Sequence, residues 1–232
     1  MAAVVEFVGL PGTGKTTLAR AVADELTNRG IPVSEPTHDI ETRPGISRVI
    51  SKSRFAATSL RRHPNTAFSA SRSVLETSQQ SPIDYVRVLF NLLYVSGVVM
   101  THRSAHGACL LDQGVYQGVW SVGIQSSYEW QKILNPFGNL LQRASPDLIV
   151  FVEANKTTIA DRVRERADGD TRFEPASNPF DWGLDGYEQL KSYAQSIENG
   201  PQSICIENET GDALQPNAMR IAGEIQALTD LT

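Results

Sequence analysis

Eight residues near the N-terminus have the types and spacing of a phosphate-binding loop. Gly9-Leu10-Pro11-Gly12-Thr13-Gly14-Lys15-Thr16 matches G-x-x-x-x-G-K-[ST] at every fixed position, between an apolar segment and a helical pattern. Glycines there let backbone N–H groups turn toward a phosphate, and the helix start adds partial positive charge. Lys15 is expected to bridge the β- and γ-phosphates of ATP, and the Thr16 hydroxyl to bind Mg²⁺. The ATP-binding residues are therefore expected to be Gly9, Pro11, Gly12, Thr13, Gly14, Lys15, Thr16 and Thr17.

Two carboxylates follow apolar segments that read as strands. Asp112 comes directly after residues 109–111, and Glu35 comes after residues 31–34. A carboxylate at such a strand end can hold Mg²⁺ or accept the proton of an attacking hydroxyl. Asp112 joins Thr16 as a candidate metal ligand, and either acid is a candidate base. The alternative is a simple turn residue, and Asp39 competes with Glu35 for the catalytic role.

Arginines cluster later in the chain, around a polar segment. Arg162 and Arg166 lie one helical turn apart, and Arg172 follows in the loop 168–172. Guanidinium groups suit the negative charge that spreads over a transferring phosphoryl group, so these three arginines are catalytic candidates in a lid of about residues 162–179. The alternative is a helix laced with ion pairs to neighbouring acids.

The charge of the chain is unevenly distributed. Seven of its 21 basic residues lie between Thr42 and Leu75, where there is no Asp or Glu, although the chain has 26 acidic residues and a net charge of −5. A basic segment in an acidic protein favours an anionic ligand, with Arg61 and Arg62 as candidate contacts for a phosphate acceptor. A solvated helical face would give the same pattern. The seven residues are Arg43, Arg48, Lys52, Arg54, Arg61, Arg62 and Arg72.

Strand and helix patterns alternate along the chain. Strands are expected at 3–8, 31–34, 108–111, 148–152 and 203–206, and helices at 16–29, 83–102, 157–167, 182–197 and 213–228. The basic segment is expected to be helical, with breaks at Pro44-Gly45 and Pro64. This alternation predicts an α/β fold: a three-layer sandwich with a five-stranded parallel sheet. Ligands of such sheets bind at the carboxyl ends of the strands.

The length and composition fit a single globular domain. The chain has 232 residues, of which 41% are hydrophobic. Cys109 and Cys205 are expected to be buried thiols in strands, neither a disulfide nor a metal pair. No signal peptide is expected, and no apolar stretch is expected to approach a membrane span. We therefore expect a reduced, cytoplasmic protein that does not bind a membrane.

Several segments together resemble the thymidylate kinase family. Val33-Ser34-Glu35-Pro36 resembles its R-E-P-G segment and the E-P of deoxynucleoside kinases, whose glutamate acts as base. The segment 146–152 resembles the family's P-D-L strand, 162–174 its lid, and Gly186-Tyr187 a G-Y pair in the helix beyond. The resemblance implies a P-loop NTPase fold of nucleotide-kinase type, in which residues 1–232 form one kinase domain with an acceptor-side insert at about 36–107. It also implies ATP and Mg²⁺ as cofactors.

The sequence departs from this family after the third strand. The family has Asp-Arg-Tyr or Asp-Arg-His there, and the nucleoside kinases have Glu-Arg-Ser, whereas this chain has Asp112-Gln113-Gly114. Gln113 cannot supply the charge of that arginine. The acceptor-phosphate arginine of the preceding helix has no clear match either, because counting back reaches Asn91, with Arg87 one turn earlier.

The expected activity is ATP-dependent transfer of the γ-phosphate to a nucleotide, a nucleoside or a related acceptor. One alternative is a polynucleotide 5′-hydroxyl kinase, in which residues 43–72 track a phosphodiester backbone. Another is a nucleotide-dependent regulatory NTPase with little transfer activity. The expected partner is a small, anionic phosphate acceptor, with nucleic acid as the alternative and a homodimer as a further expectation.

Overall fold

Five parallel strands form one sheet in the order β2-β3-β1-β4-β5. The computed structural model describes residues 2–77, 79, 81–124, 126, 128–165 and 178–230. The strands are β1 (Ala3–Val8), β2 (Val33–Ser34), β3 (Ala108–Leu111), β4 (Leu148–Glu153) and β5 (Gln202–Glu207). The predicted five-stranded parallel sheet is therefore confirmed, and the order places the end of β1 between β3 and β4.

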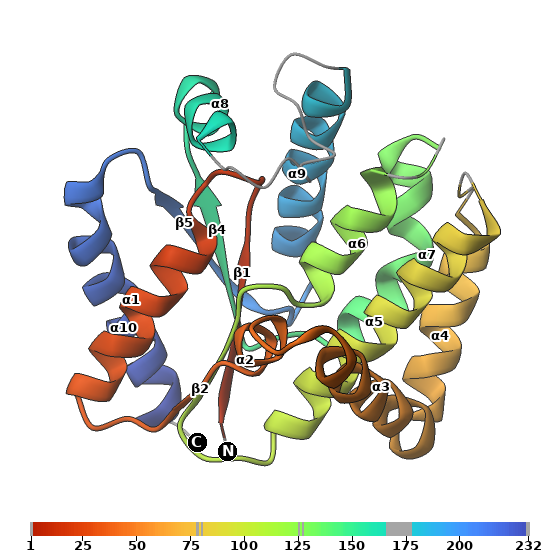
Figure 1. The fold of residues 1–232 in the computed structure, drawn as a ribbon, viewed down its shortest axis with the longest axis horizontal. Helices are drawn as coiled ribbons and strands as arrows, with labels where there is room; N and C mark the ends of the chain where they lie inside the picture. The colour runs from red at the N-terminus through yellow and green to blue at the C-terminus, as the bar shows by residue number, and fades with distance from the viewer. Residues whose placement is uncertain are drawn as a thin grey trace.

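Helices cover both faces of the sheet, which gives the expected three layers (Figure 1). Val5 and Phe7 of β1 belong to one buried cluster with α1 (Lys15–Asn28) and α10 (Leu214–Asp230). Val4 and Val8 point the other way and belong to a second cluster with α5 (Pro82–His102), α6 (Val115–Ile124), α7 (Trp130–Arg143) and α9 (Asn178–Ser196). Burial of both faces explains why β3 and most of β4 read as continuous apolar runs.

The segment between β2 and α5 folds into three helices. These are α2 (Pro36–Glu41), α3 (Gly45–Arg62) and α4 (Pro64–Leu75). The expected breaks at Pro44-Gly45 and Pro64 are confirmed, because each proline stands at a helix start. Helix α3 packs along α5, where a Cβ on Gly97 would lie 2.2 Å from the Phe55 carbonyl oxygen. After β4 comes α8 (Lys156–Arg164), and a short 3₁₀ helix (Gly211–Ala213) precedes α10.

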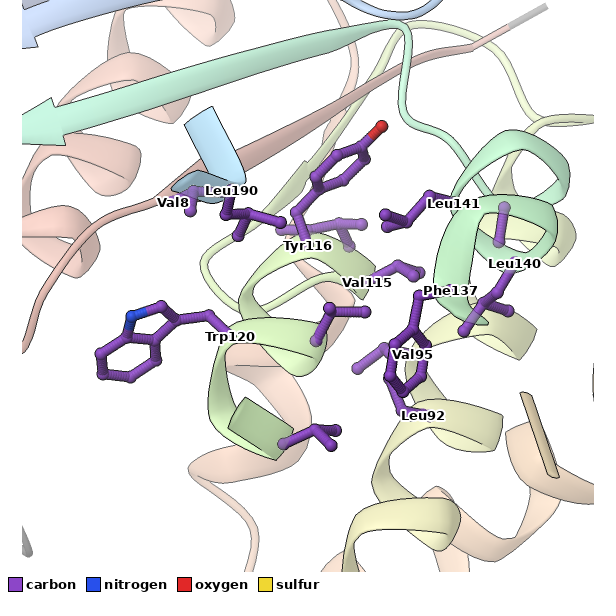
Figure 2. Close-up of a cluster of buried hydrophobic side chains, with 14 of the residues drawn as sticks. Val8, Leu92, Val95, Val115, Tyr116, Trp120, Phe137, Leu140, Leu141 and Leu190 are labelled. Carbon is purple, nitrogen blue, oxygen red and sulfur yellow. The ribbon is translucent and has the colours of Figure 1, made fainter. Parts of the chain in front are cut away.

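Helices α6 and α7 were not expected from the sequence, and they build much of the second cluster. In Figure 2, Val115 and Tyr116 of α6 lie among side chains of α5 and α7. The apolar positions of α7 recur three and four residues apart despite the internal Pro136, so one face of this helix is buried. The labelled residues of the neighbouring helices are Leu92 and Val95 on α5, Phe137, Leu140 and Leu141 on α7, and Leu190 on α9.

The indole of Trp130 is wedged between two glycines on different helices. A Cβ on Gly123 of α6 or on Gly186 of α9 would lie 1.9 Å from a ring carbon of Trp130. The ring is 1% exposed, and its N–H donates to the Trp182 carbonyl at 3.0 Å. Trp130 therefore sets the spacing of α6 and α9, which meet the sheet on the same side.

The two cysteines differ in exposure. Cys109 in β3 is buried, as expected, and its burial raises the pKa of its thiol to about 12. Cys205 in β5 is exposed, so the expectation that it is buried is wrong. It lies on an edge strand, and the next residue, Ile206, carries the inward-facing position.

Helix α5 corrects the expectation that no apolar stretch approaches a membrane span. It has 21 residues and a mean hydropathy of 1.5 over its most apolar window, which is long and apolar enough to cross a membrane. Half of that window is buried inside the structure, against α3, α4 and α6. A core helix of a globular protein meets the same criterion.

Candidate active site

The loop from Gly9 to Gly14 joins the end of β1 to the first turn of α1. Gly12 and Gly14 have φ angles of 93° and 87°, which favour glycine, and a Cβ on Gly14 would lie 2.5 Å from the Asn208 side chain. The Thr13 hydroxyl donates to the Leu10 carbonyl at 2.9 Å and holds the loop closed. The helix start behind this loop provides N–H groups and partial positive charge for an anion.

Lys15 and Thr16 open α1 beside this loop. The Lys15 ammonium donates to the Gly9 carbonyl at 2.7 Å and to the Leu10 carbonyl at 3.1 Å, so it lies over the loop. The Thr16 hydroxyl donates to Asp112 Oδ2 at 3.5 Å. The structure therefore brings the end of β3 to the start of α1, as the sequence predicted.

The Thr16–Asp112 pair has the donor chemistry that Mg²⁺ requires. Both groups offer oxygen, and Asp112 Oδ1 is a buried atom with no hydrogen-bond partner among the described residues. Within the described ranges no three His, Cys, Asp or Glu side chains are grouped as a metal site. These two residues therefore fit a magnesium ion that takes its other ligands from phosphate and water.

A cavity of about 280 Å³ opens in front of the loop. Its lining joins Gly12, Lys15 and Thr16 to Asp112 and to the first turns of α6. A second cavity of about 300 Å³ adjoins it, because Asn91, Gln113, Gly118 and Ser121 line both. The phosphate loop thus faces two adjoining cavities bounded by α5 and α6.

The second cavity is bordered by two basic side chains, Lys52 of α3 and Arg87 of α5. Glu41 at the end of α2 accepts hydrogen bonds from Lys52 at 2.5 Å and from Arg48 at 3.2 Å. Burial opposes the charged form of its carboxyl, but the contacts with the two basic side chains outweigh burial and lower its pKa. The Lys52 ammonium also lies 5.1 Å from the centre of the Tyr94 ring. The Lys52 side chain is 20% exposed, and its contacts with Glu41 and Tyr94 hold it at the cavity wall.

The basic segment divides between two cavities, and the expected contact of Arg61 and Arg62 with an acceptor stays a prediction. Lys52 faces the cavity beside the phosphate loop, but Arg62 lines a different cavity between α2, α3 and α5. Arg61 is exposed and lines neither cavity. The basic side chains of the cavity next to the phosphate loop are therefore Lys52 and Arg87.

Glu35 lies at the end of β2, directly before α2. Partial burial raises the pKa of its carboxyl, and the charges of Asp39 and Asp112 raise it further, against His38 and Arg20. The interaction with Asp112 shows that the two candidate bases share one edge of the sheet. Only Asp112 lines the cavity in front of the loop.

A buried carboxylate that the sequence analysis missed organises the start of α6. Glu6 in β1 is fully buried and accepts a hydrogen bond from the Gln117 backbone N–H at 2.7 Å. The Gln117 side-chain oxygen accepts in turn from the Gly9 N–H at 3.1 Å. Burial raises the Glu6 pKa to about 7, against the N–H groups of residues 114–117. The signal in the sequence that could have identified this role is the position of Glu6, a charged residue inside the apolar strand β1.

Arg162 lies on the other side of the phosphate loop. Its guanidinium donates to the carbonyls of Gly12, Thr13, Asn208 and Glu209 at 2.9–3.4 Å. Together with Gly12, Gly14 and Thr17, it lines a further cavity of about 340 Å³. Its predicted contact with phosphate stays a prediction. Arg166 and Arg172, and the lid from 166 to 177, lie outside the described residues.

Sheet order, phosphate loop and strand-end carboxylate together define a P-loop NTPase fold of nucleotide-kinase type. A family model described as an AAA domain matches residues 4–190. The chain therefore belongs to this AAA domain family. No curated protein matches the chain in a sequence comparison.

Solved structures with a similar fold include deoxyadenosine kinase from M. mycoides in several ligand states. The complex with dCMP and dCDP has a TM-score of 0.58 at 12% identity, over 97% of this chain and 99% of that chain. The dATP complex has a TM-score of 0.56 at 11% identity, over 95% and 99%. The dCTP complex has a TM-score of 0.53 at 11% identity, over 97% and 99%. These similarities establish a shared fold.

Proposed function

We propose that this protein is an ATP-dependent phosphotransferase of the thymidylate-kinase-like group, acting on a small anionic nucleoside or nucleotide-type acceptor. One observation carries the proposal: the cavity at the phosphate loop adjoins a second cavity with Lys52 and Arg87 on its wall. Each cavity is small, near the lower end of the range of about 300–1,000 Å³ for small-molecule sites. A donor and a small acceptor can therefore meet in front of Asp112.

In this proposal the chain's own residues divide the work. The loop N–H groups and Lys15 bind the donor phosphates and stabilise the charge that develops during transfer. Thr16 and Asp112 hold Mg²⁺, which would neutralise phosphate charge. Asp112 is also the carboxylate in position to accept a proton if the acceptor reacts through a hydroxyl group, with Glu35 as the alternative base.

Lys52 and Arg87 take the place of the arginine that the resembled families have after the third strand. Gln113 occupies that position here and lines both cavities together with Asn91. Positive charge reaches the same space from α3 and α5 instead. This supports an acceptor that carries a phosphate or another anionic group near its reacting atom. Such a kinase is proposed to act in the cytoplasm, where ATP is available.

The proposal is tested by measuring phosphorylated product and ADP with ATP and Mg²⁺ across nucleosides, nucleoside monophosphates and oligonucleotides with 5′-hydroxyl ends. Transfer to a monophosphate is the expected result. Transfer only to oligonucleotides would favour the polynucleotide kinase, and ADP release without any phosphorylated acceptor would favour the regulatory NTPase. The KM of a charged acceptor should rise with ionic strength.

A further inference from the structure

We propose that the cavity between α2, α3 and α5 is a second anion-binding site, separate from the ATP and acceptor cavities, and that it takes a small phosphate or phosphate ester. This cavity has a volume of about 320 Å³. It shares no lining residue with the two cavities at the phosphate loop. Its position is therefore distinct from the proposed reaction centre.

Three arginines supply the charge of this site. Arg54 and Arg62 come from α3, and Arg43 comes from the turn between α2 and α3. No Asp or Glu lines the cavity, and no ion pair joins these three arginines to a carboxylate among the residues that the structure describes. Forked guanidinium groups are the side chains best suited to bind a phosphate through paired hydrogen bonds.

The remaining wall supplies one hydroxyl donor and an apolar surface. Arg43 donates to the Ser51 oxygen at 2.9 Å, which leaves the Ser51 hydroxyl proton for a ligand. The hydroxyls of Thr58 and Thr101 donate to carbonyls of their own helices. Phe55 and Ile40 complete the lining. An anionic group bound by the arginines would therefore have apolar surface beside it, which fits an ester as well as a free phosphate.

The wall of this cavity is built on a close helix–helix contact, and the exposed arginines lie at its edge. Ser51, Phe55, Thr58 and Arg62 recur three and four residues apart, so they form one stripe of α3. The close approach of α3 to α5 at Gly97 fixes this stripe against Thr101. Arg61, the neighbour of Arg62, points elsewhere and does not line the cavity. Arg43, Arg54 and Arg62 are exposed, as Arg61 is, so what distinguishes the three site arginines is that they line this cavity.

The test compares two double variants that remove the same charge. Arg54→Ser/Arg62→Ser changes the cavity, whereas Arg61→Ser/Arg220→Ser removes two exposed arginines outside it. Orthophosphate, pyrophosphate and ribose 5-phosphate are titrated by calorimetry at constant ionic strength, in protein saturated with a non-hydrolysable ATP analogue and Mg²⁺. Saturation keeps these probes off the phosphate loop, and thermal melts check that both variants remain folded.

We expect the Kd of the best probe to rise by about tenfold or more in Arg54→Ser/Arg62→Ser and to stay within about twofold of wild type in the control. Stronger binding of ribose 5-phosphate than of orthophosphate would identify an ester site, and the reverse a free-phosphate site. Equal loss in both variants, or no binding of any probe, would overturn the proposal. A single-stranded oligonucleotide that binds and loses affinity equally in both variants would instead indicate a general nucleic-acid surface.

Discussion

The side-chain oxygen of Gln117 accepts a hydrogen bond from the backbone N–H of Gly9 at 3.1 Å. This contact ties the first residue of the phosphate loop to α6, the helix that lines the proposed acceptor space. The Gln117 backbone N–H is itself held by Glu6 at 2.7 Å. The phosphate loop and α6, the two sides of the proposed reaction centre, are therefore positioned by one short chain of contacts.

Replacing Gln117 with leucine should loosen the phosphate loop. The Gly9 N–H would lose its partner, which costs about 1–3 kcal/mol for a buried group. We expect a lower free energy of unfolding in urea and a higher KM for ATP. Gln142→Leu, at an exposed position of α7, is the matched control. If Gln117→Leu keeps the stability and the KM for ATP of the wild type, the contact between Gln117 and Gly9 does not position the phosphate loop.

Lys15→Ala should abolish phosphoryl transfer and leave the fold intact. Its ammonium lies over the loop and outside the hydrophobic clusters, so its loss removes charge stabilisation but little packing. The measurements are ADP release and thermal unfolding. Lys132→Ala, whose side chain is 67% exposed on α7, should behave like wild type in both. Normal turnover in Lys15→Ala would refute the assignment of the loop.

Asp112→Asn should lower kcat by about 10² or more and raise the Mg²⁺ concentration needed for half-maximal activity. Glu35→Gln should lower kcat less, because Glu35 does not line the cavity in front of the loop. Steady-state kinetics with varied Mg²⁺ distinguishes the two carboxylates. A larger loss in Glu35→Gln, with unchanged Mg²⁺ dependence in Asp112→Asn, would assign the base to Glu35.

Lys52→Ala should raise the acceptor KM at least about tenfold and leave the KM for ATP unchanged, because the cavity loses a charge that would contact the acceptor. Lys52→Arg should restore part of the effect. Arg48 is bound by the same carboxylate, Glu41, but does not line the cavity. Arg48→Ala is therefore the control for loss of an ion pair alone. If Arg48→Ala and Lys52→Ala raise the acceptor KM equally, Lys52 does not contact the acceptor.

Glu6 should make stability depend on pH. Its pKa is about 7 in the folded protein against 4.5 for an unperturbed carboxyl, so between these values the folded state binds more protons than the unfolded state. Stability is therefore expected to fall as pH rises from about 4.5 to about 7, by roughly 3 kcal/mol. The measurement is the difference between urea unfolding curves of wild type and Glu6→Gln from pH 5 to pH 8. A difference that does not change with pH would contradict this prediction.

Features carried by contiguous residues could be predicted from the sequence. The spacing of glycines, lysine and threonine from Gly9 to Thr16 predicts the phosphate loop. Four apolar residues before Asp112 predict strand β3. The proline-bounded helices α3 and α4 were also visible. In each case the local residue pattern alone determines the element, so the prediction required no knowledge of contacts distant in the sequence.

Helices α6 and α7 escaped prediction for local reasons. The sequence of α6 holds β-branched residues and two glycines, all poor helix formers, and α7 contains Pro136. Packing against α5 and α9 overrides these propensities. The contacts of Gln117 with Gly9 and of Lys52 with Glu41 join residues on different elements of secondary structure, so no local spacing rule could have identified them.

The wedge of Trp130 between Gly123 and Gly186 implies that these three positions evolve together. Alanine at either glycine would overlap the indole, so it should be accepted only when residue 130 is smaller. In a double-mutant cycle, Gly123→Ala should therefore cost much less in a Trp130→Leu background than in wild type. Among related sequences, we expect a small side chain at position 130 wherever alanine or serine stands at positions 123 and 186. The residues at these three positions would then indicate how closely α6 and α9 are spaced in each member of the family.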